Sequence, residues 1–335
     1  MHPSNSPNPT PSRRRLITFP RLLAVVMFVF VSVLFIRVNA EWIGVYGFAT
    51  FVGIPIACGL LAAYIVGESG TLMENVILFV ISAVLGVMLL ATVGAALLVS
   101  LAEGMLCIAM AIPIALPFLA AGLAVGWIVK KTVTWTANKF LTLATILSIA
   151  PLMMGVELAI EPIAPVYEVK SFIDVAAPPE TVWQNVVTFP PLDEPTEFMF
   201  RAGIAYPMHA TIDREGAGAI RRCIFNTGDF VEPIEIWEPP CLLRFAVIEN
   251  ASPMIERGLF GPIDTPHLHG YMESKRGQFR LVPLADGGTR IEGTTWYSHG
   301  LYPAWYWRLW SDHIIHGIHM RVLNHIKEVS EAATR

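Results

Sequence analysis

The chain has 335 residues, of which 54% are hydrophobic and 15% are charged, whereas soluble proteins average roughly 45–50% and about 25%. This composition excludes a disordered chain and an ordinary soluble enzyme. Residues 1–160 carry eight Lys or Arg and five Asp or Glu, and residues 161–335 carry fifteen and twenty-two. The acidic second half excludes nucleic acid as an expected partner, because neutralising phosphate needs clustered Lys and Arg.

The first half is predicted to be a membrane domain. Residues 1–20, rich in Pro, Ser, Asn and Arg, are expected to form a disordered tail. Five apolar segments within 21–160 approach or exceed the roughly 20 residues that a spanning helix needs. The expected spans are 21–38, 42–66, 75–101, 104–129 and 140–158. The first span also fits a cleavable secretory signal ending at Ala40, but an uncleaved anchor is preferred because Arg37 crowds that site.

Basic residues orient this domain. Arg13–Arg15 and Arg21 precede the first span, and Lys130, Lys131 and Lys139 lie between the fourth and fifth, against Arg37 alone on the opposite side. Since Lys and Arg concentrate in cytoplasmic loops, both clusters are predicted to be cytoplasmic. Five spans then place the second half outside. If the last span, which Pro151 interrupts, does not cross, the second half is cytoplasmic.

The second half predicts an antiparallel sheet closed by a long helix. After a stiff, proline-containing linker over 161–167, Tyr167–Val175 alternates like a strand and Ala177–Trp183 begins a helix. Short turn signals separate seven further strand-like runs: 207–213, 217–226, 230–237, 241–248, 267–273, 278–284 and 289–297. Residues 249–266 are expected to form a longer loop. Tyr302–Ala333 has helical periodicity throughout and predicts one long helix.

Three motifs and the long last helix resemble the START/Bet v 1-like superfamily (SRPBCC), the group of polyketide cyclases and lipid-transport domains. They are Phe172–Trp183, Gly277–Leu284 and Gly288–Glu292. The resemblance covers about 168–333 and implies an α+β helix-grip domain behind an all-α membrane bundle. Glu103-Gly104 and Gly293–Tyr297 are also similar to a bacterial group that fuses these two parts, which implies a bacterial multi-pass protein of the inner (cytoplasmic) membrane. With the orientation given by the basic residues, the C-terminal domain is then expected to be periplasmic.

Members of that superfamily hold an apolar ligand between the concave face of the sheet and the last helix, and the resemblance implies the same here. Alternation and helical spacing select the candidate ligand-binding residues. They are Phe245, Phe279, Leu281, Ile291, Gly293, Thr295, Tyr297, Ile315, Ile318, His319 and Val322. A one-residue register error would reverse any strand set, and each position also fits an ordinary filled core.

Other chemistry has less support. His313, His316 and His319 recur at three-residue spacing, but each step rotates the ring by roughly 60° around the helix, so hydrogen bonding or one titratable pocket group is preferred to a metal site. The sequence contains no nucleophile motif. We therefore expect no catalytic residue, no metal and no cofactor. Cys223 and Cys241 are expected to be free, buried thiols because a strand separates them.

Two further features stay open between alternatives. The aromatic run Tyr302–Trp310 fits a collar at the membrane or cavity mouth, or plain core. Glu103, between the third and fourth spans, fits a contact with the second half or, by preference, a solvated loop charge.

The expected function is membrane-anchored binding, and possible transfer, of a membrane lipid or other apolar small molecule. The protein is expected to be a binding protein rather than an enzyme. The alternatives are a cyclase- or dehydratase-type enzyme that uses a pocket His or Glu, and a non-catalytic sensor or assembly module. Neither ligand identity nor oligomeric state follows from the sequence.

Overall fold

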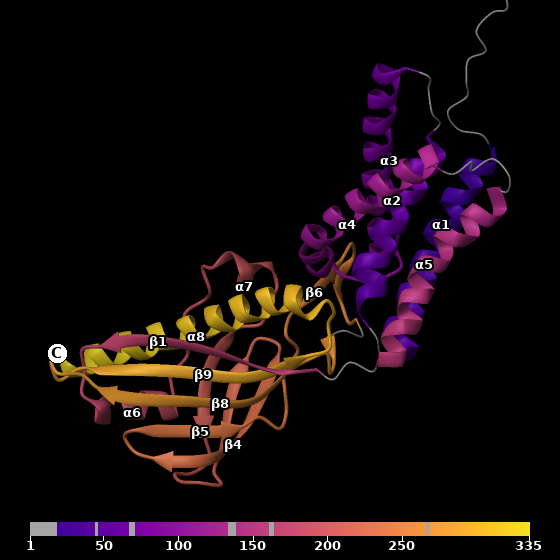
Figure 1. The fold of residues 1–335 in the computed structure, drawn as a ribbon. Helices are drawn as coiled ribbons and strands as arrows, with labels where there is room; N and C mark the ends of the chain where they lie inside the picture. Colours follow the sequence, from indigo (N-terminus) through magenta and orange to yellow (C-terminus); the bar gives the residue numbers. More distant parts are fainter. Residues whose placement is uncertain (1–18, 44–45, 67–70, 133–138, 161–163, 266–267) are drawn as a thin grey trace, which may run out of the picture.

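A computed structural model describes residues 19–43, 46–66, 71–132, 139–160, 164–265 and 268–335. Residues 1–18 of the predicted tail, with Arg13–Arg15, and part of the predicted linker lie outside these residues, while Phe19 and Pro20 of that tail already belong to a helix. The chain forms a helical bundle followed by a curled sheet with a long helix laid along it (Figure 1). The bundle contains α1 (Phe19–Val38), the π-helical turns η1 (Asn39–Ile43) and η2 (Ala49–Gly53), α2 (Ile54–Ile65), α3 (Leu72–Val99), α4 (Met105–Thr132) and α5 (Lys139–Ile160).

Four helices of the described part are long and apolar enough to cross a membrane, not the five that the sequence predicts: α1, α3, α4 and α5. The expected span 42–66 is wrong as a full-length span. Its continuous apolar helix covers only Ala49–Ile65, because Tyr46 pairs with Leu301 instead of continuing a helix. Seventeen residues give roughly 25 Å, less than the roughly 30 Å hydrocarbon core.

The short helix α2 is the core of the bundle. Leu61, Ala62 and Ala63 are fully buried, and two glycines let the backbones of α2 and α4 touch. A Cβ on Gly59 would lie 2.2 Å from the Leu119 carbonyl oxygen, and one on Gly122 would lie 2.2 Å from that of Ile56. Small residues permit such close crossings between apolar helices.

The short helix also runs from one end of the bundle to the other. η2 and α2 form one continuous helix, Ala49–Ile65. Tyr46, shortly before this helix, pairs with Leu301 of the C-terminal half. Val66, just after it, accepts a hydrogen bond from Lys130 near the end of α4. The ends of α2 and α4 at Val66 and Lys130 therefore lie at the far end of the bundle from the C-terminal half.

The C-terminal half is one seven-stranded antiparallel sheet in the order β1-β9-β8-β5-β4-β3-β2. Its edge strands β1 and β2 both contact α8, so the sheet curls around that helix, as the sequence predicts (Figure 1). The strands are β1 (Val166–Val175), β2 (Pro207–Ile212), β3 (Ile220–Phe225), β4 (Gly228–Glu238), β5 (Leu242–Ala246), β8 (Met272–Pro283) and β9 (Thr289–His299), and the helices are α6 (Pro179–Val187), α7 (Phe198–Ala202) and α8 (Ala304–Thr334).

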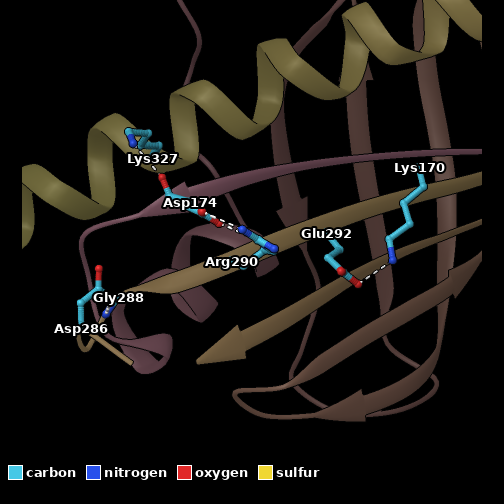
Figure 2. Close-up of polar contacts among 7 residues, drawn as sticks. All are labelled: Lys170, Asp174, Asp286, Gly288, Arg290, Glu292 and Lys327. Carbon is cyan, nitrogen blue, oxygen red and sulfur yellow. Dashed lines mark hydrogen bonds and ion pairs between the residues drawn. The ribbon is translucent and has the colours of Figure 1, made fainter. Parts of the chain in front are cut away.

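Polar pairs on the outer face of β1 and β9 show which side chains point outward (Figure 2). Arg290 Nε lies 2.7 Å from Asp174 Oδ1, and Lys170 Nζ lies 2.9 Å from Glu292 Oε2. Such exposed pairs add little stability, but they mark the register. Because side chains alternate along a strand, Lys170 and Asp174 facing outward place Ser171 on the face that α8 covers.

The sequence predicts a turn at Lys275–Gly277, between the strand-like runs 267–273 and 278–284, and this prediction is wrong. Strand β8 continues through it, with a bulge between Ser274 and Arg276. A Cβ on Gly277 would lie 2.3 Å from the Phe245 ring of the neighbouring strand. Glycine is therefore needed here for close packing and not for a turn, which is why its sequence signal was misleading.

The expected loop 249–266 contains a small hairpin, β6 (Glu256–Gly258) and β7 (Gly261–Ile263), that joins the two halves. Glu256 is fully buried and accepts hydrogen bonds from the backbone amides of Leu106 and Cys107 at the start of α4. Glu103 is only 3% exposed and accepts a hydrogen bond from the Tyr46 hydroxyl. The preferred interpretation of Glu103 as a solvated loop charge is therefore wrong.

The aromatic run at the start of α8 also packs into this junction. Tyr306 and Trp307 are 7% and 4% exposed. The Tyr306 hydroxyl donates to the Met110 carbonyl oxygen of α4, and the Trp307 ring centroid lies 4.8 Å from that of Phe51. The two halves therefore share one hydrophobic core cluster at their boundary.

Candidate functional site

A cavity of about 150 Å³ lies between the concave face of the sheet and α8. Its wall is mainly apolar, with Phe189, Phe225 and Phe230 contributing rings from the connection after α6 and from β3 and β4. Eight of the eleven residues that the sequence selects line it: Phe245, Phe279, Gly293, Thr295, Ile315, Ile318, His319 and Val322.

The other three selected residues are core residues that do not line the cavity. Leu281 is 3% exposed, and Ile291 and Tyr297 are fully buried. Leu281 and Ile291 pack with the α6 and α8 side chains, and the Tyr297 hydroxyl donates to Asp312 Oδ1 at 2.6 Å. Alternation identified the correct face of each strand, but which part of that face stays open depends on how α6 and α8 cover it.

Arg221 and Glu232 form a buried ion pair in the cavity wall, which the sequence analysis missed. They are 1% and 6% exposed, and their side chains are in direct contact. Arg221 also donates from Nε to the Val187 carbonyl oxygen at 3.0 Å. Burial raises the pKa of Glu232, and the neighbouring guanidinium opposes that rise. Strand alternation contained the signal, since it places Arg221 on the face of Cys223 and Phe225.

His319 is a second polar group in the wall. Its Nε2 lies 2.8 Å from Thr295 Oγ1, and its Nδ1 lies 3.1 Å from Ser171 Oγ. Burial, with a smaller contribution from the nearby His316, lowers the pKa of His319 to about 4. The imidazole is therefore neutral near pH 7, with one ring nitrogen as donor and the other as acceptor.

One part of the cavity wall lies next to the junction of the two halves. It contains Asn250, Ala251, Pro253 and Met254 from the loop before β6, together with Met272 and Ile314. Ile314 also belongs to the core cluster shared with the bundle. Two residues beyond Met254, Glu256 contacts the first turn of α4. The segment that borders the cavity is thus continuous with the one that contacts the bundle.

Within the described residues, no group of three His, Cys, Asp or Glu side chains is arranged to hold a metal ion. His316 and His319 both contact Ser171, while His313 is exposed. Cys223 and Cys241 are free, as expected, but only Cys223 is buried. The expected burial of Cys241 is wrong because this residue lies in the turn before β5. Burial raises the pKa of the Cys223 thiol to about 12.

No protein-family model matches the sequence, and no curated protein matches it. Solved structures of single domains are similar to about half of the chain. A norcoclaurine synthase from Thalictrum flavum is 12% identical over 52% of this chain and 99% of its own, with a TM-score of 0.34. An aromatase/cyclase from Streptomyces sp. R1128 is 16% identical over 51% and 97%, with a TM-score of 0.33. A protein from Nitrosospira multiformis is 18% identical over 50% and 100%, also with a TM-score of 0.33.

Proposed function

We propose that the protein binds a lipid or other apolar small molecule, carrying a single polar group, in the cavity between the sheet and α8. The cavity itself carries this proposal. Ligand pockets are typically apolar with a few placed polar groups, and here Phe-rich walls surround the Arg221–Glu232 pair and His319. Apolar contact would supply the affinity at about 25 cal/mol per Å² buried, and the polar groups would orient the molecule.

The bundle would anchor this site in a membrane. Four long apolar helices support anchoring, and the part of the cavity wall that precedes Glu256 at the start of α4 would keep the cavity close to bilayer lipid. The basic residues before α1 and between α4 and α5 would orient the end of the bundle at Val66 and Lys130, far from the C-terminal half, toward the cytoplasm. The cavity would then lie on the outer side of the cytoplasmic membrane, and transfer of a ligand between bilayer and cavity would extend the same function.

Gly293→Leu tests the proposal. A Cβ at this position would meet Phe279, His319 and Leu323 at 3.7–3.9 Å, which is ordinary contact, so the extra atoms would occupy cavity space. We expect apolar molecules to co-purify with the full-length protein and to be lost from this variant, with only a small decrease in melting temperature. Mass spectrometry of organic extracts measures the first quantity and thermal unfolding measures the second.

Gly155→Leu is the matched control, because nothing lies within 4 Å of a Cβ there. It should retain the co-purifying molecules. If Gly293→Leu unfolds the protein with no separable loss of ligand, the space is ordinary core and the domain is a structural or assembly module.

A second candidate function is an enzyme that uses acid–base chemistry on an apolar substrate. It is favoured by one observation, the neutral imidazole of His319 in the cavity wall. General bases are often imidazoles with access to the substrate. Turnover lost in His319→Gln while binding persists would select this candidate over simple binding.

A further inference from the structure

Four side chains form a continuous hydrogen-bonded row from the protein surface to the cavity. His316 is exposed, and its Nδ1 lies 2.7 Å from the hydroxyl of Ser171. Ser171, only 2% exposed, also contacts His319 Nδ1 at 3.1 Å. His319 Nε2 in turn lies 2.8 Å from Thr295 Oγ1, and Thr295 lines the cavity.

While both imidazoles are neutral, the three hydrogen bonds among these four side chains can be made in only two ways, as a count of the available hydrogens shows. Ser171 has one hydroxyl hydrogen and faces two ring nitrogens, so it donates to one and accepts from the other. If Ser171 donates to His316, His319 must carry its hydrogen on Nδ1 and accept at Nε2 from Thr295. If Ser171 donates to His319 instead, His319 carries its hydrogen on Nε2 and donates to Thr295. Thr295 therefore offers the cavity an acceptor oxygen in the first arrangement and a donor hydrogen in the second.

Protonation of His316 selects one arrangement. A protonated imidazole donates from both nitrogens, so Ser171 must accept from His316 and donate to His319. The pKa of His319 is lowered to about 4, mainly by burial, so this ring stays neutral when His316 gains a proton. Thr295 is then locked as a donor toward the cavity.

We propose that Ser171, His316, His319 and Thr295 act as one chain that transmits the protonation state of surface His316 to the polar anchor of the cavity. The ligand this implies is an apolar molecule whose single polar group meets Thr295. When His316 is protonated the site prefers an acceptor group, such as a carbonyl or ether oxygen, over a donor group. This inference rests on the proposed function, since it requires that the cavity bind an apolar molecule.

Other titratable groups lie on the helix of His316 and on the elements packed against that helix, and the test must separate their titration from that of His316. Asp312 is held by the Tyr297 hydroxyl and by Arg308, and Lys170 of β1 is held by Glu292. Helix α7 meets α8 at Gly317 through uncharged Met199 and Phe200. The groups to be considered are Asp312, His313 and His319 on α8, Lys170 and Asp174 on β1, and Arg201 on α7.

Three bicyclic probes of similar size test the proposal: indene has no polar group, indole has only an N–H donor, and 1-indanone has only a carbonyl acceptor. Binding to the full-length protein in lipid nanodiscs is measured by calorimetry at about pH 8 and about pH 5, where histidine side chains differ most in protonation, with empty nanodiscs subtracted. We expect the affinity ratio of indanone to indole to rise about fivefold or more on acidification, the equivalent of one net hydrogen bond of about 1 kcal/mol. A ratio taken at each pH cancels general effects of pH on the protein.

Ser171→Ala is the decisive variant, because it cuts the chain while leaving every titratable group in place. The ratio should become independent of pH in this variant and in His316→Ala. In Thr295→Val, of the same shape, neither polar probe should bind better than its apolar surface predicts. Melting temperatures check that each variant is folded.

The outcomes separate this inference from the proposed function. If indene does not bind the wild-type protein, the cavity proposal itself fails. If indene binds but the wild-type ratio is the same at both pH values, or if Ser171→Ala keeps the wild-type pH dependence, the chain does not transmit protonation and the inference is overturned.

Discussion

Arg221 shows how a single residue defines this cavity. It is the largest side chain among the described residues that are less than 2% exposed. Its guanidinium lies 5.4 Å from the Phe245 ring centroid and 5.8 Å from that of Phe279. Removing a charge from water is costly unless it is paired, and Glu232 supplies the pair. A buried ion pair adds little net stability to a fold. The main effect of Arg221 in this position is therefore to place a polar group in the wall of an apolar cavity.

We expect Arg221→Met to destabilise the protein by about 3–5 kcal/mol, because it leaves the Glu232 carboxylate buried and unpaired. The double variant Arg221→Met/Glu232→Leu should recover most of this loss, since both charges are then removed. Denaturant unfolding of the full chain in micelles measures both values. A double variant that is less stable than the single one would mean that the ion pair itself stabilises the fold.

Among the secondary-structure elements, the β6–β7 hairpin contributes most to joining the two halves. Glu256 places a negative charge at the amino end of α4, where free amides and the helix dipole favour an anion. Glu103 lies beside it, between α3 and α4, and is buried with Tyr46. The pKa of Glu103 is raised to about 8: burial is the main cause, Glu256 adds to the rise, and the hydrogen bond from Tyr46 opposes it.

This raised pKa predicts that the junction weakens as pH rises. The unfolded chain releases the Glu103 proton near its ordinary value of 4.5, whereas the folded protein holds it until about pH 8. Folding stability therefore falls with increasing pH across that window. Melting temperatures in micelles between about pH 5 and pH 9 should show this fall, and Glu103→Gln, which mimics the protonated form, should flatten it. An equal slope in the variant would assign the effect to another group.

At the scale of the whole molecule, the two halves lie at opposite ends of one elongated arrangement (Figure 1). Val66 and Lys130 mark the far end of the bundle, and Tyr46, Glu103 and the start of α4 mark the end at the curled sheet. The helix Ala49–Ile65, formed by η2 and α2, runs between these ends although it is shorter than a full span. Within the described residues, the polypeptide therefore runs along the bundle five times, and four of these helices are long enough to cross a membrane.

We expect this arrangement to place the C-terminal domain on the opposite side of the membrane from the loop between α4 and α5. A reporter that is active only outside the cytoplasm, fused after Arg335, should be active, and the same reporter inserted in that loop should be silent. The opposite pattern would mean that basic residues do not orient this bundle. Activity at both sites would mean that α5 does not cross.

Local sequence patterns determined the secondary structure well. The apolar windows located the four long apolar helices, and alternation located the inward faces of β5, β8 and β9, because both patterns report burial residue by residue. The same patterns misjudged Gly277 and the segment 42–66. A glycine that packs against a neighbouring strand has the same local sequence signal as a glycine in a turn. A helix enclosed by other helices is as apolar as one that faces lipid.

The sequence by itself determined that an apolar helical half precedes a curved sheet with a closing helix, because hydrophobic periodicity is a local property. Only the tertiary structure decided which inward residues line open space, that Arg221 meets Glu232, and that Ser171 lies between His316 and His319. Ser171 and His319 are far apart in the chain and meet only because β1 lies beside α8. No local pattern encodes a contact of that kind, since it depends on how the sheet curls and where the helix crosses it.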